Sequence, residues 1–188
     1  MAMFSSVSRC TLLLAFVTLV SDSLQAADEI VLTAEDGKTA QIVASMVSSR
    51  HINHPEINDA LSERLLKRYL EIWDPQKLYF LQSDIDEFSQ KKSSLDDEIL
   101  RGDVLFAANV FNRFRSRMDV RAATLDALID RDVDFTVEEE MIRDAKEISW
   151  ASTAEELDER WRKRIKFDLL MLKMDDIDLE EARKRLHK

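Results

Sequence analysis

Two histidines three residues apart, His51 and His54, are the residues of this chain whose types and spacing most resemble a pair of metal ligands. The third histidine, His187, is distant in sequence, and the single cysteine, Cys10, lies near the N-terminus. Zinc requires three or four well-placed ligands with supporting partners. We therefore interpret residues 51–55 as a polar turn that ends a helix, and the sequence predicts no metal site.

Paired carboxylates could perform general acid–base chemistry, and the chain has such pairs at Asp84 with Asp86 and at Asp96 with Asp97. Catalytic carboxylates need a cleft and displaced pKa values. Nothing in the sequence indicates a cleft, and exposed acids at helix starts are the interpretation we favour. The sequence contains no GxSxG, GxxxxGK[ST] or HExxH motif. It predicts no catalytic residue and no cofactor.

The basic segment WRKRIK, residues 161–166, could bind a nucleic acid or another anionic surface. The alternative is a helix in which Trp161 and Ile165 point inward and the basic side chains cover the solvated side, with Glu159 pairing to Lys163. The formal net charge is −10, and phosphate repels such a chain. We favour the helical interpretation and expect no nucleic-acid partner.

The N-terminus has the three-part pattern of a secretory signal peptide, which we assign to residues 1–26. Arg9 supplies positive charge, Leu12–Val20 is an apolar run, and SDSLQAA ends in small residues. Cleavage is expected after Ala26, with Ala27 as the alternative. The apolar run is too short to span a bilayer, which takes about 20 residues. A buried N-terminal helix is the less favoured interpretation.

Glycine and proline are scarce in the remaining sequence, residues 27–188. The whole chain has only two of each, while 45% of its residues are hydrophobic and 34% are charged. Sheets and glycine-lined ligand sites need turns that favour these two residues, whereas this much apolar material is enough for a packed core. The composition therefore predicts an all-α fold, an irregular multi-helix domain of five to seven helices.

Capping residues and apolar periodicity indicate where several helices begin and what they bury. Thr33, Thr153 and Asp178 are expected as N-caps, and Gly102 as the residue that ends a helix before a new start at Asp103. Three helices show apolar stripes at helical spacing. The first stripe, in a helix from Asn58 to Asp74, is Leu61, Leu65, Tyr69 and Ile72. The second, in a helix from Val104 to Ile129, is Phe111, Phe114, Met118, Ala122, Leu125 and Ile129. The third, in the helix that Thr153 caps, is Leu157, Trp161, Ile165, Leu169 and Leu172.

The most distinctive stretch is DPQKLYFLQSDIDEF, residues 74–88. Asp74 and Pro75 should end one helix, and Ser83 or Asp84 should start the next. The apolar run between them, Leu78–Leu81, is expected to insert into the core, where burying one large side chain is worth roughly 1.5–3 kcal/mol. We therefore predict a packed corner. The alternative is an exposed surface that docks a substrate or an adaptor.

This stretch, together with WRKRIKFDLL at residues 161–170, resembles the N-terminal helical region of bacterial tail-specific (carboxy-terminal processing) proteases. RYLEIWDPQ at residues 68–76 and ISWASTAEELDERW at residues 148–161 fit the same pattern. The resemblance covers nearly all of the expected mature chain, from about Leu32 to the end. Eight residues occupy the family pattern, and their roles are structural: Asp74, Pro75, Leu78, Tyr79, Phe80, Leu81, Asp84 and Trp161.

The resemblance implies a secreted serine endopeptidase of the cell envelope. In such enzymes a PDZ-like domain recognises the apolar carboxyl-terminal tail of a protein substrate, and a serine–lysine pair on a protease domain cuts the chain. Both domains follow the helical region, and no residue of this chain corresponds to that serine or lysine. We expect residues 27–188 to be the helical N-terminal domain, which supports those domains and contacts an envelope adaptor in the periplasm. A stand-alone secreted binding protein and a broken gene without a product are the alternatives.

Overall fold

The computed structural model describes residues 29–53 and 55–188, and this part of the chain contains α-helices and no β-strand, which confirms the all-α class. Residues 1–26, Ala27 and His54 lie outside the described residues, and with them the expected signal peptide. The helices are α1 (Ala34–Arg50), α2 (Asp59–Trp73), α3 (Gln82–Ser89), α4 (Leu95–Leu100), α5 (Leu105–Ile129), α6 (Ala154–Met174) and α7 (Leu179–Leu186).

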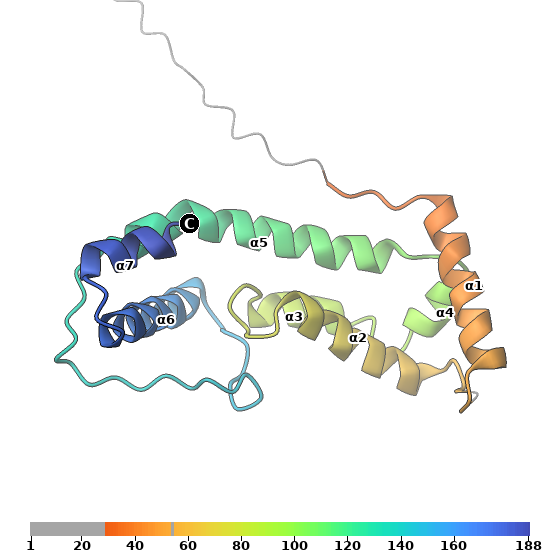
Figure 1. Cartoon of the computed structure of the whole chain (residues 1–188). Helices are drawn as coiled ribbons and strands as arrows, with labels where there is room; N and C mark the ends of the chain where they lie inside the picture. Colours follow the sequence, from red (N-terminus) through yellow and green to blue (C-terminus); the bar gives the residue numbers. More distant parts are fainter. Residues whose placement is uncertain (1–28, 54) are drawn as a thin grey trace, which may run out of the picture.

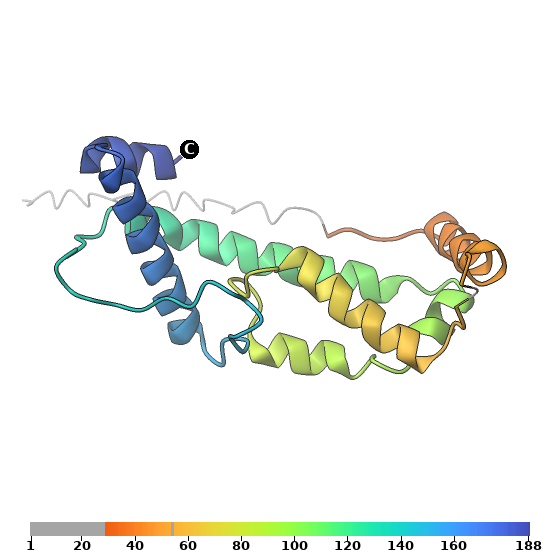
Figure 2. The ribbon, with the colours of Figure 1, turned by 60° about the horizontal axis from the view of Figure 1, so that its bottom comes forward.

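The 25-residue helix α5 runs along the length of the molecule, and the other helices are arranged beside it (Figure 1). α1 and α4 lie at the end where α5 begins, α2 and α3 lie along its first half, and α6 and α7 lie at its far end. After α5 a long loop, residues 130–153, passes around α6 and returns to the middle of the molecule (Figure 2). Each described helix is too short or too polar to cross a membrane.

Two separate hydrophobic cores lie along α5. The first joins α2, α3, α4 and the first half of α5, and its buried residues are Leu66, Leu70, Phe80, Phe88, Leu95 and Val110. The second joins the last turns of α5 to α6 and α7, and its buried residues are Ile129, Ile165, Leu169 and Ala182. The two cores share only α5. The position of α6 relative to α2 and α3 therefore depends on contacts made by the segments that connect these helices.

The N-caps expected at Thr33, Thr153 and Asp178 are present, but two other helix starts were predicted wrongly. α3 begins at Gln82 after Leu81 rather than at Ser83 or Asp84, and the N-cap of α5 is Val104 rather than Asp103. The Thr33 hydroxyl accepts a hydrogen bond from Asp36 N–H, and the Asp36 carboxylate accepts one from Thr33 N–H at 2.7 Å. Thr153 and Asp178 cap α6 and α7 in the same way through their side chains. Gly102 follows α4 with φ of 78°, in the left-handed region that favours glycine. Capping side chains satisfy helix-end N–H groups that have no partner within the helix.

The predicted stripe of α2 is wrong by one residue in register. Leu66 and Leu70 are buried, whereas Leu65 and Ile72 are exposed. The other two predicted residues, Leu61 and Tyr69, are half-buried, and Tyr69 packs against the first core. The same buried face carries Ser62, whose hydroxyl donates to Asp96 Oδ1 at 2.7 Å and accepts from Asp96 N–H. A search for apolar periodicity does not detect a buried polar pair of this kind. The predicted buried face of α2 is therefore displaced by one residue from the observed one.

The predicted stripe of α5 fails in its middle. Phe114 packs against the first core and Ile129 lies in the second, but Met118 is exposed and Ala122 faces solvent. Arg121 is buried instead. Between the two cores, α5 therefore presents an arginine to the interior rather than an apolar side chain.

Helix α1 packs on α4 and the turn after it, and the backbones approach closely at one point. A Cβ at Gly37 would lie 2.2 Å from the carbonyl oxygen of Gly102, so only glycine fits there. Next to it, Gln41 Nε2 donates to the carbonyl oxygen of Leu100 at 2.9 Å. Glycine within a helix is unfavourable by itself, and here it permits α1 to pack on the turn between α4 and α5.

We predict that Gly37→Ala destabilises the protein. Overpacking costs about 1–3 kcal/mol, while alanine in place of a helical glycine is ordinarily worth about 1 kcal/mol in the opposite direction. Because the obstacle is backbone rather than a flexible side chain, we expect a net loss of unfolding free energy in urea. The matched control is Lys38→Ala at the exposed neighbouring position, which should change stability by less than about 0.5 kcal/mol. A Gly37→Ala protein as stable as the wild type would contradict this packing.

Candidate functional site

The corner at residues 74–84 is built on Asp74, the C-cap of α2, whose side chain is only 2% exposed. Its carboxylate accepts hydrogen bonds from the backbone N–H groups of Leu78, Tyr79 and Phe80 at 2.8, 2.8 and 2.9 Å. Burial raises the pKa of this carboxyl, and the backbone N–H groups oppose that rise. The carboxylate thus supplies hydrogen-bond acceptors for the backbone N–H groups that follow the end of α2.

The chain reverses at Lys77, which has φ of 55°. Such a left-handed conformation costs a non-glycine residue about 1–2 kcal/mol. Lys77 Nζ donates to the carbonyl oxygen of Ile148 at 2.5 Å and lies 5.4 Å from the centre of the Trp150 ring. These contacts, with the Asp74 hydrogen bonds that follow, hold the turn.

The apolar run after the turn enters the interior. Phe80 is fully buried in the first core and packs edge-on against Phe88 and Phe114. Leu78, Tyr79 and Leu81 are half-buried, and the Tyr79 ring packs edge-on between Phe114 and Trp161 at centroid distances of 5.1 and 5.6 Å. The run is therefore part of the packing between the first core and α6.

Asp84 closes the corner with a second buried carboxylate, 0% exposed, on the first turn of α3. It accepts from Leu81 N–H at 2.9 Å, the half of a capping box that a leucine N-cap allows. Arg117 donates to both carboxylate oxygens at 2.9 Å, and Arg113 donates to one of them. Burial acts to raise the pKa of Asp84, but the hydrogen bonds from Arg117, Leu81 and Arg113 prevail and the pKa is lowered.

Sequence reasoning missed the arginines of α5. Arg113, Arg117 and Arg121 follow one another at intervals of four, which places them on one face of the helix. The first two hold Asp84. Arg121 pairs with Asp158 of α6 at 2.7 Å and lies over the Trp161 ring at 5.5 Å. The regular spacing of these arginines in NRFRSRMDVR was the signal that could have identified this row.

The corner is also bonded to the segment that enters α6. Gln82 N–H donates to the carbonyl oxygen of Ala151 at 2.7 Å, forming a single parallel bridge beside Leu81. Trp161 Nε1 donates to the carbonyl oxygen of Leu78 at 2.7 Å. Hydrogen bonds between residues more than 60 positions apart thus fix α6 against the corner.

The basic residues of 161–166 contact a loop rather than cover a solvated face. Arg162 pairs with Glu139 and Glu159, and Lys166 pairs with Glu139 at 2.6 Å. These hydrogen bonds lower the pKa of Glu139 to about 2. Lys163 donates to the carbonyl oxygen of Glu140, so the expected Glu159–Lys163 pair is replaced by Glu159–Arg162. Ile165 is buried and Trp161 half-buried, as the helical interpretation expected.

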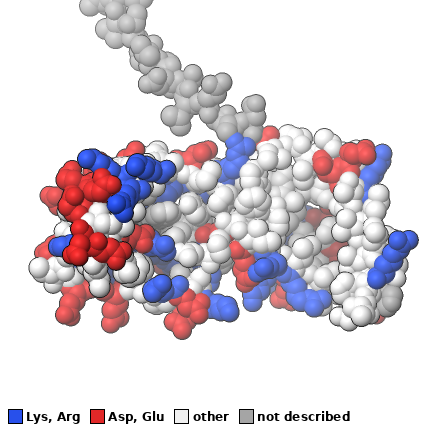
Figure 3. Space-filling view, viewed as in Figure 1, with Lys and Arg blue, Asp and Glu red and all other residues white. Residues whose placement is uncertain are grey.

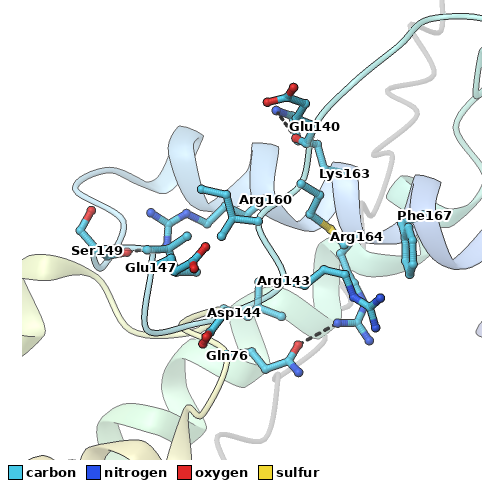
Figure 4. A pocket seen from close by; sticks show the side chains of 14 residues that line it. Gln76, Glu140, Arg143, Asp144, Glu147, Ser149, Arg160, Lys163, Arg164 and Phe167 are labelled. Carbon is cyan, nitrogen blue, oxygen red and sulfur yellow. Dashed lines mark hydrogen bonds between the residues drawn. The ribbon is translucent and has the colours of Figure 1, made fainter.

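A groove of about 830 Å³ lies beside the corner, between residues 76–78, the loop 140–149 and α6 (Figure 4). Its basic side chains already have partners. Arg164 donates to Gln76 Oε1 at 2.7 Å and Arg160 to the carbonyl oxygen of Ser149 at 2.9 Å. Apolar surface is contributed by Phe167, with Arg143 over its ring at 5.4 Å. The groove can accommodate a peptide segment, and it holds no recognisable nucleophile–base pair.

The residues considered for chemistry are not brought together. His51 is exposed at the end of α1, where its Nδ1 accepts from Asn53 N–H. Within residues 29–53 and 55–188 no group of three His, Cys, Asp or Glu side chains could hold a metal ion. The expectation that the acid pairs are simply exposed is wrong for one member of each pair. Asp84 and Asp96 are buried and hydrogen-bonded, because each secures a packed helix start, whereas Asp86 and Asp97 are exposed.

Fold and site define an all-helical domain organised around a hydrogen-bonded corner. A family model described as the tail specific protease N-terminal domain matches residues 42–188. The chain belongs to this family. It is 26% identical over 158 residues to the tail-specific protease of Haemophilus influenzae, an alignment that covers 84% of this chain and 23% of that protein. The chain therefore spans less than a quarter of the length of this curated relative.

We predict that Asp74→Asn lowers the unfolding free energy by about 1–3 kcal/mol, because an amide cannot accept from all three buried N–H groups and presents its own donors to them. The matched control is Asp86→Asn, an exposed acid just after the corner whose carboxylate accepts a hydrogen bond from Gln82 Nε2. It should change stability by less than about 0.5 kcal/mol. Urea unfolding measures both, and equal effects would show that the Asp74 contacts do not hold the turn.

Asp84 gives a pH-dependent prediction. Its folded-state pKa is lowered, so its stabilising contribution is fully present above the ordinary aspartate pKa of about 3.9 and is lost as the pH falls through the folded pKa. Asp84→Asn should cost about 1–3 kcal/mol at pH 7, and the difference from wild type should shrink at pH 3. Asp74 is present in both proteins and cancels. A difference that stays constant between pH 7 and pH 3 would contradict the ionised clamp.

Proposed function

We propose that this chain is the non-catalytic N-terminal scaffold domain of a periplasmic tail-specific serine endopeptidase, which degrades or processes proteins from apolar C-terminal tails. In that enzyme a PDZ-like domain and a protease domain with a serine–lysine pair follow residues 27–188. Residues 1–26 direct export and are removed after Ala26 or Ala27. The partners are these two domains, protein substrates and an envelope adaptor, with no nucleic acid among them.

One observation carries the scaffold role: the corner uses its buried charges to hold its own chain. Asp74 is bonded to backbone N–H groups and Asp84 to arginines of α5. Neither carboxylate is open to a substrate. Buried carboxylates that are fully hydrogen-bonded fix helices relative to one another. A domain that positions other domains requires this rigidity. The eight residues of the family pattern include both aspartates and Trp161, whose indole N–H bonds to the same corner.

A stand-alone secreted binding or adaptor protein without peptidase activity is the second candidate. The groove of about 830 Å³ favours it, because a concave surface with apolar side chains between charged walls can take a peptide segment without any enzyme attached. The two candidates differ in what the cell contains: a long enzyme in the first case and a small protein in the second.

The test is the mass and activity of the native protein. An antibody against residues 105–174 is used on periplasmic and cytoplasmic fractions, and the captured protein is given a reporter with an apolar C-terminal tail. We expect a periplasmic band several times larger than 21.8 kDa that cleaves this reporter. The control reporter, identical except for a charged tail, should survive. The isolated residues 27–188 should cleave neither.

A periplasmic band slightly below 21.8 kDa, with no cleavage, would overturn the proposal and favour the stand-alone binding protein. Cleavage by the isolated chain would overturn the non-catalytic role. In the long enzyme, Asp74→Asn should lower activity only in parallel with folded protein, as expected for a scaffold residue. A loss of turnover at unchanged stability would instead place Asp74 in the catalytic machinery.

A further inference from the structure

Helix α1 is apolar on the face that points away from the molecule. Its inner face is buried at Gly37 and Ala44, against α4 and the turn that follows. On the opposite face, Ile42, Val43 and Met46 are 61, 53 and 48% exposed. Large apolar side chains gathered on one exposed helix face indicate an interaction surface. Figure 3 shows uncharged atoms over α1 together with acidic side chains near its N-terminal end and basic side chains at the same end of the molecule.

The same outer face carries opposite charges at its two ends. Glu35 lies in the first turn and Arg50 is the last residue of the helix. Glu35, Thr39, Met46 and Arg50, with Ile42 between them, are spaced at three or four residues, so they form one stripe. Within the described part of the chain, neither Glu35 nor Arg50 forms an ion pair through its side chain.

We propose that this outer stripe of α1 binds α1 of a second copy of the same chain, antiparallel, about a two-fold axis between Ile42 and Val43. Across that axis Ile42 faces Val43 of the second copy. Thr39 faces Met46, and Glu35 faces Arg50. A two-fold contact is isologous and repeats each of these pairs, so two ion pairs flank a central apolar contact.

Charge complementarity selects a second copy as the occupant. Glu35 and Arg50 are equally distant from the proposed axis, so an antiparallel pair matches both at once, whereas a parallel pair would place like charges together. Antiparallel helices also bring each N-terminus to the opposite C-terminus, which their dipoles favour. This local match opposes the general repulsion expected between two chains of net charge −10.

The surface is accessible and firmly held. α1 lies at one end of the molecule, so a second copy can approach it without meeting α5, α6 or α7 (Figures 1 and 2). The close approach of Gly37 to Gly102 fixes its orientation. From Glu35 to Arg50 the stripe is about 24 Å long. A single helix pair of this length is smaller than a standard stable interface, so the dimer should be weak and concentration-dependent.

The first experiment is sedimentation equilibrium of residues 27–188 over roughly 10 µM to 1 mM, the range in which weak dimers dissociate. We expect the mass to rise from monomer towards dimer. The double substitution Ile42→Glu with Val43→Glu should keep the chain monomeric throughout. Ile72→Glu is the matched control, an isoleucine 57% exposed on α2, and it should leave the dimer intact. Circular dichroism checks that each variant is folded.

The second experiment tests the pairing by charge exchange. Glu35→Lys or Arg50→Glu alone should weaken the dimer about tenfold, because each places like charges together at both ends. The double variant should recover the wild-type dissociation constant within about threefold. Glu63→Lys on α2 makes the same change of net charge as Glu35→Lys outside the stripe, and it should not weaken the dimer.

A monomer at every concentration would overturn the proposal and leave another partner as the occupant of the stripe. A dimer that survives Ile42→Glu with Val43→Glu, or single charge variants that the exchange does not rescue, would overturn this pairing as well. The charge exchange remains decisive if the double glutamate variant fails to fold. None of these outcomes involves peptidase activity, so the inference stands or falls independently of the proposed function.

Discussion

Burial of the Asp84 carboxylate is the constraint on which the rest of the structure depends. A carboxylate removed from water is costly unless it is paired and fully hydrogen-bonded. Here the partners come from two directions: the N–H of Leu81 from the corner, and Arg113 and Arg117 from α5. Satisfying one charge therefore fixes both the start of α3 and its position against the long helix. Displacing α5 would leave this charge without its arginines, which makes the arrangement close to all-or-none.

A third arginine on the same face of α5 forms a similar charged contact with the second half of the molecule. Arg121, one turn after Arg117, pairs with Asp158 of α6 instead of Asp84, and its guanidinium lies over the Trp161 ring. Trp161 in turn bonds to the corner through the Leu78 carbonyl. The corner, α5 and α6 are thus each in contact with the other two, and these contacts join the first core, at Phe80, to α6. Polar contacts and the packing of Tyr79 against Trp161 both contribute there.

The sequence predicts the parts of this structure that depend on local chemistry. The cap at Thr33 and the turn at Gly102 follow from rules about helix ends, and the family was already apparent from residues 74–88. The predicted stripe of α2 was wrong because Ser62 and Asp96 form a buried pair that only the tertiary fold brings together. Asp84 was expected to be exposed for a similar reason. Its partners lie about thirty residues away, and periodicity within one segment does not report charges that meet across segments.

Helix α7 is held to the rest of the molecule by the second core and by contacts of its last residues with α5. α7 has eight residues and buries Ala182 in the second core, with Leu179 and Leu186 packed against the same core. Its end is joined to α5 by His187, whose two ring nitrogens lie 2.9 Å from Asp126 and Asp130. These hydrogen bonds raise the pKa of His187, so its contribution is present below about 6.5 and fades as the pH rises through the higher folded value. The Asp84 clamp and the His187 contact thus respond to opposite changes in pH: the first weakens as the pH falls, and the second weakens as the pH rises.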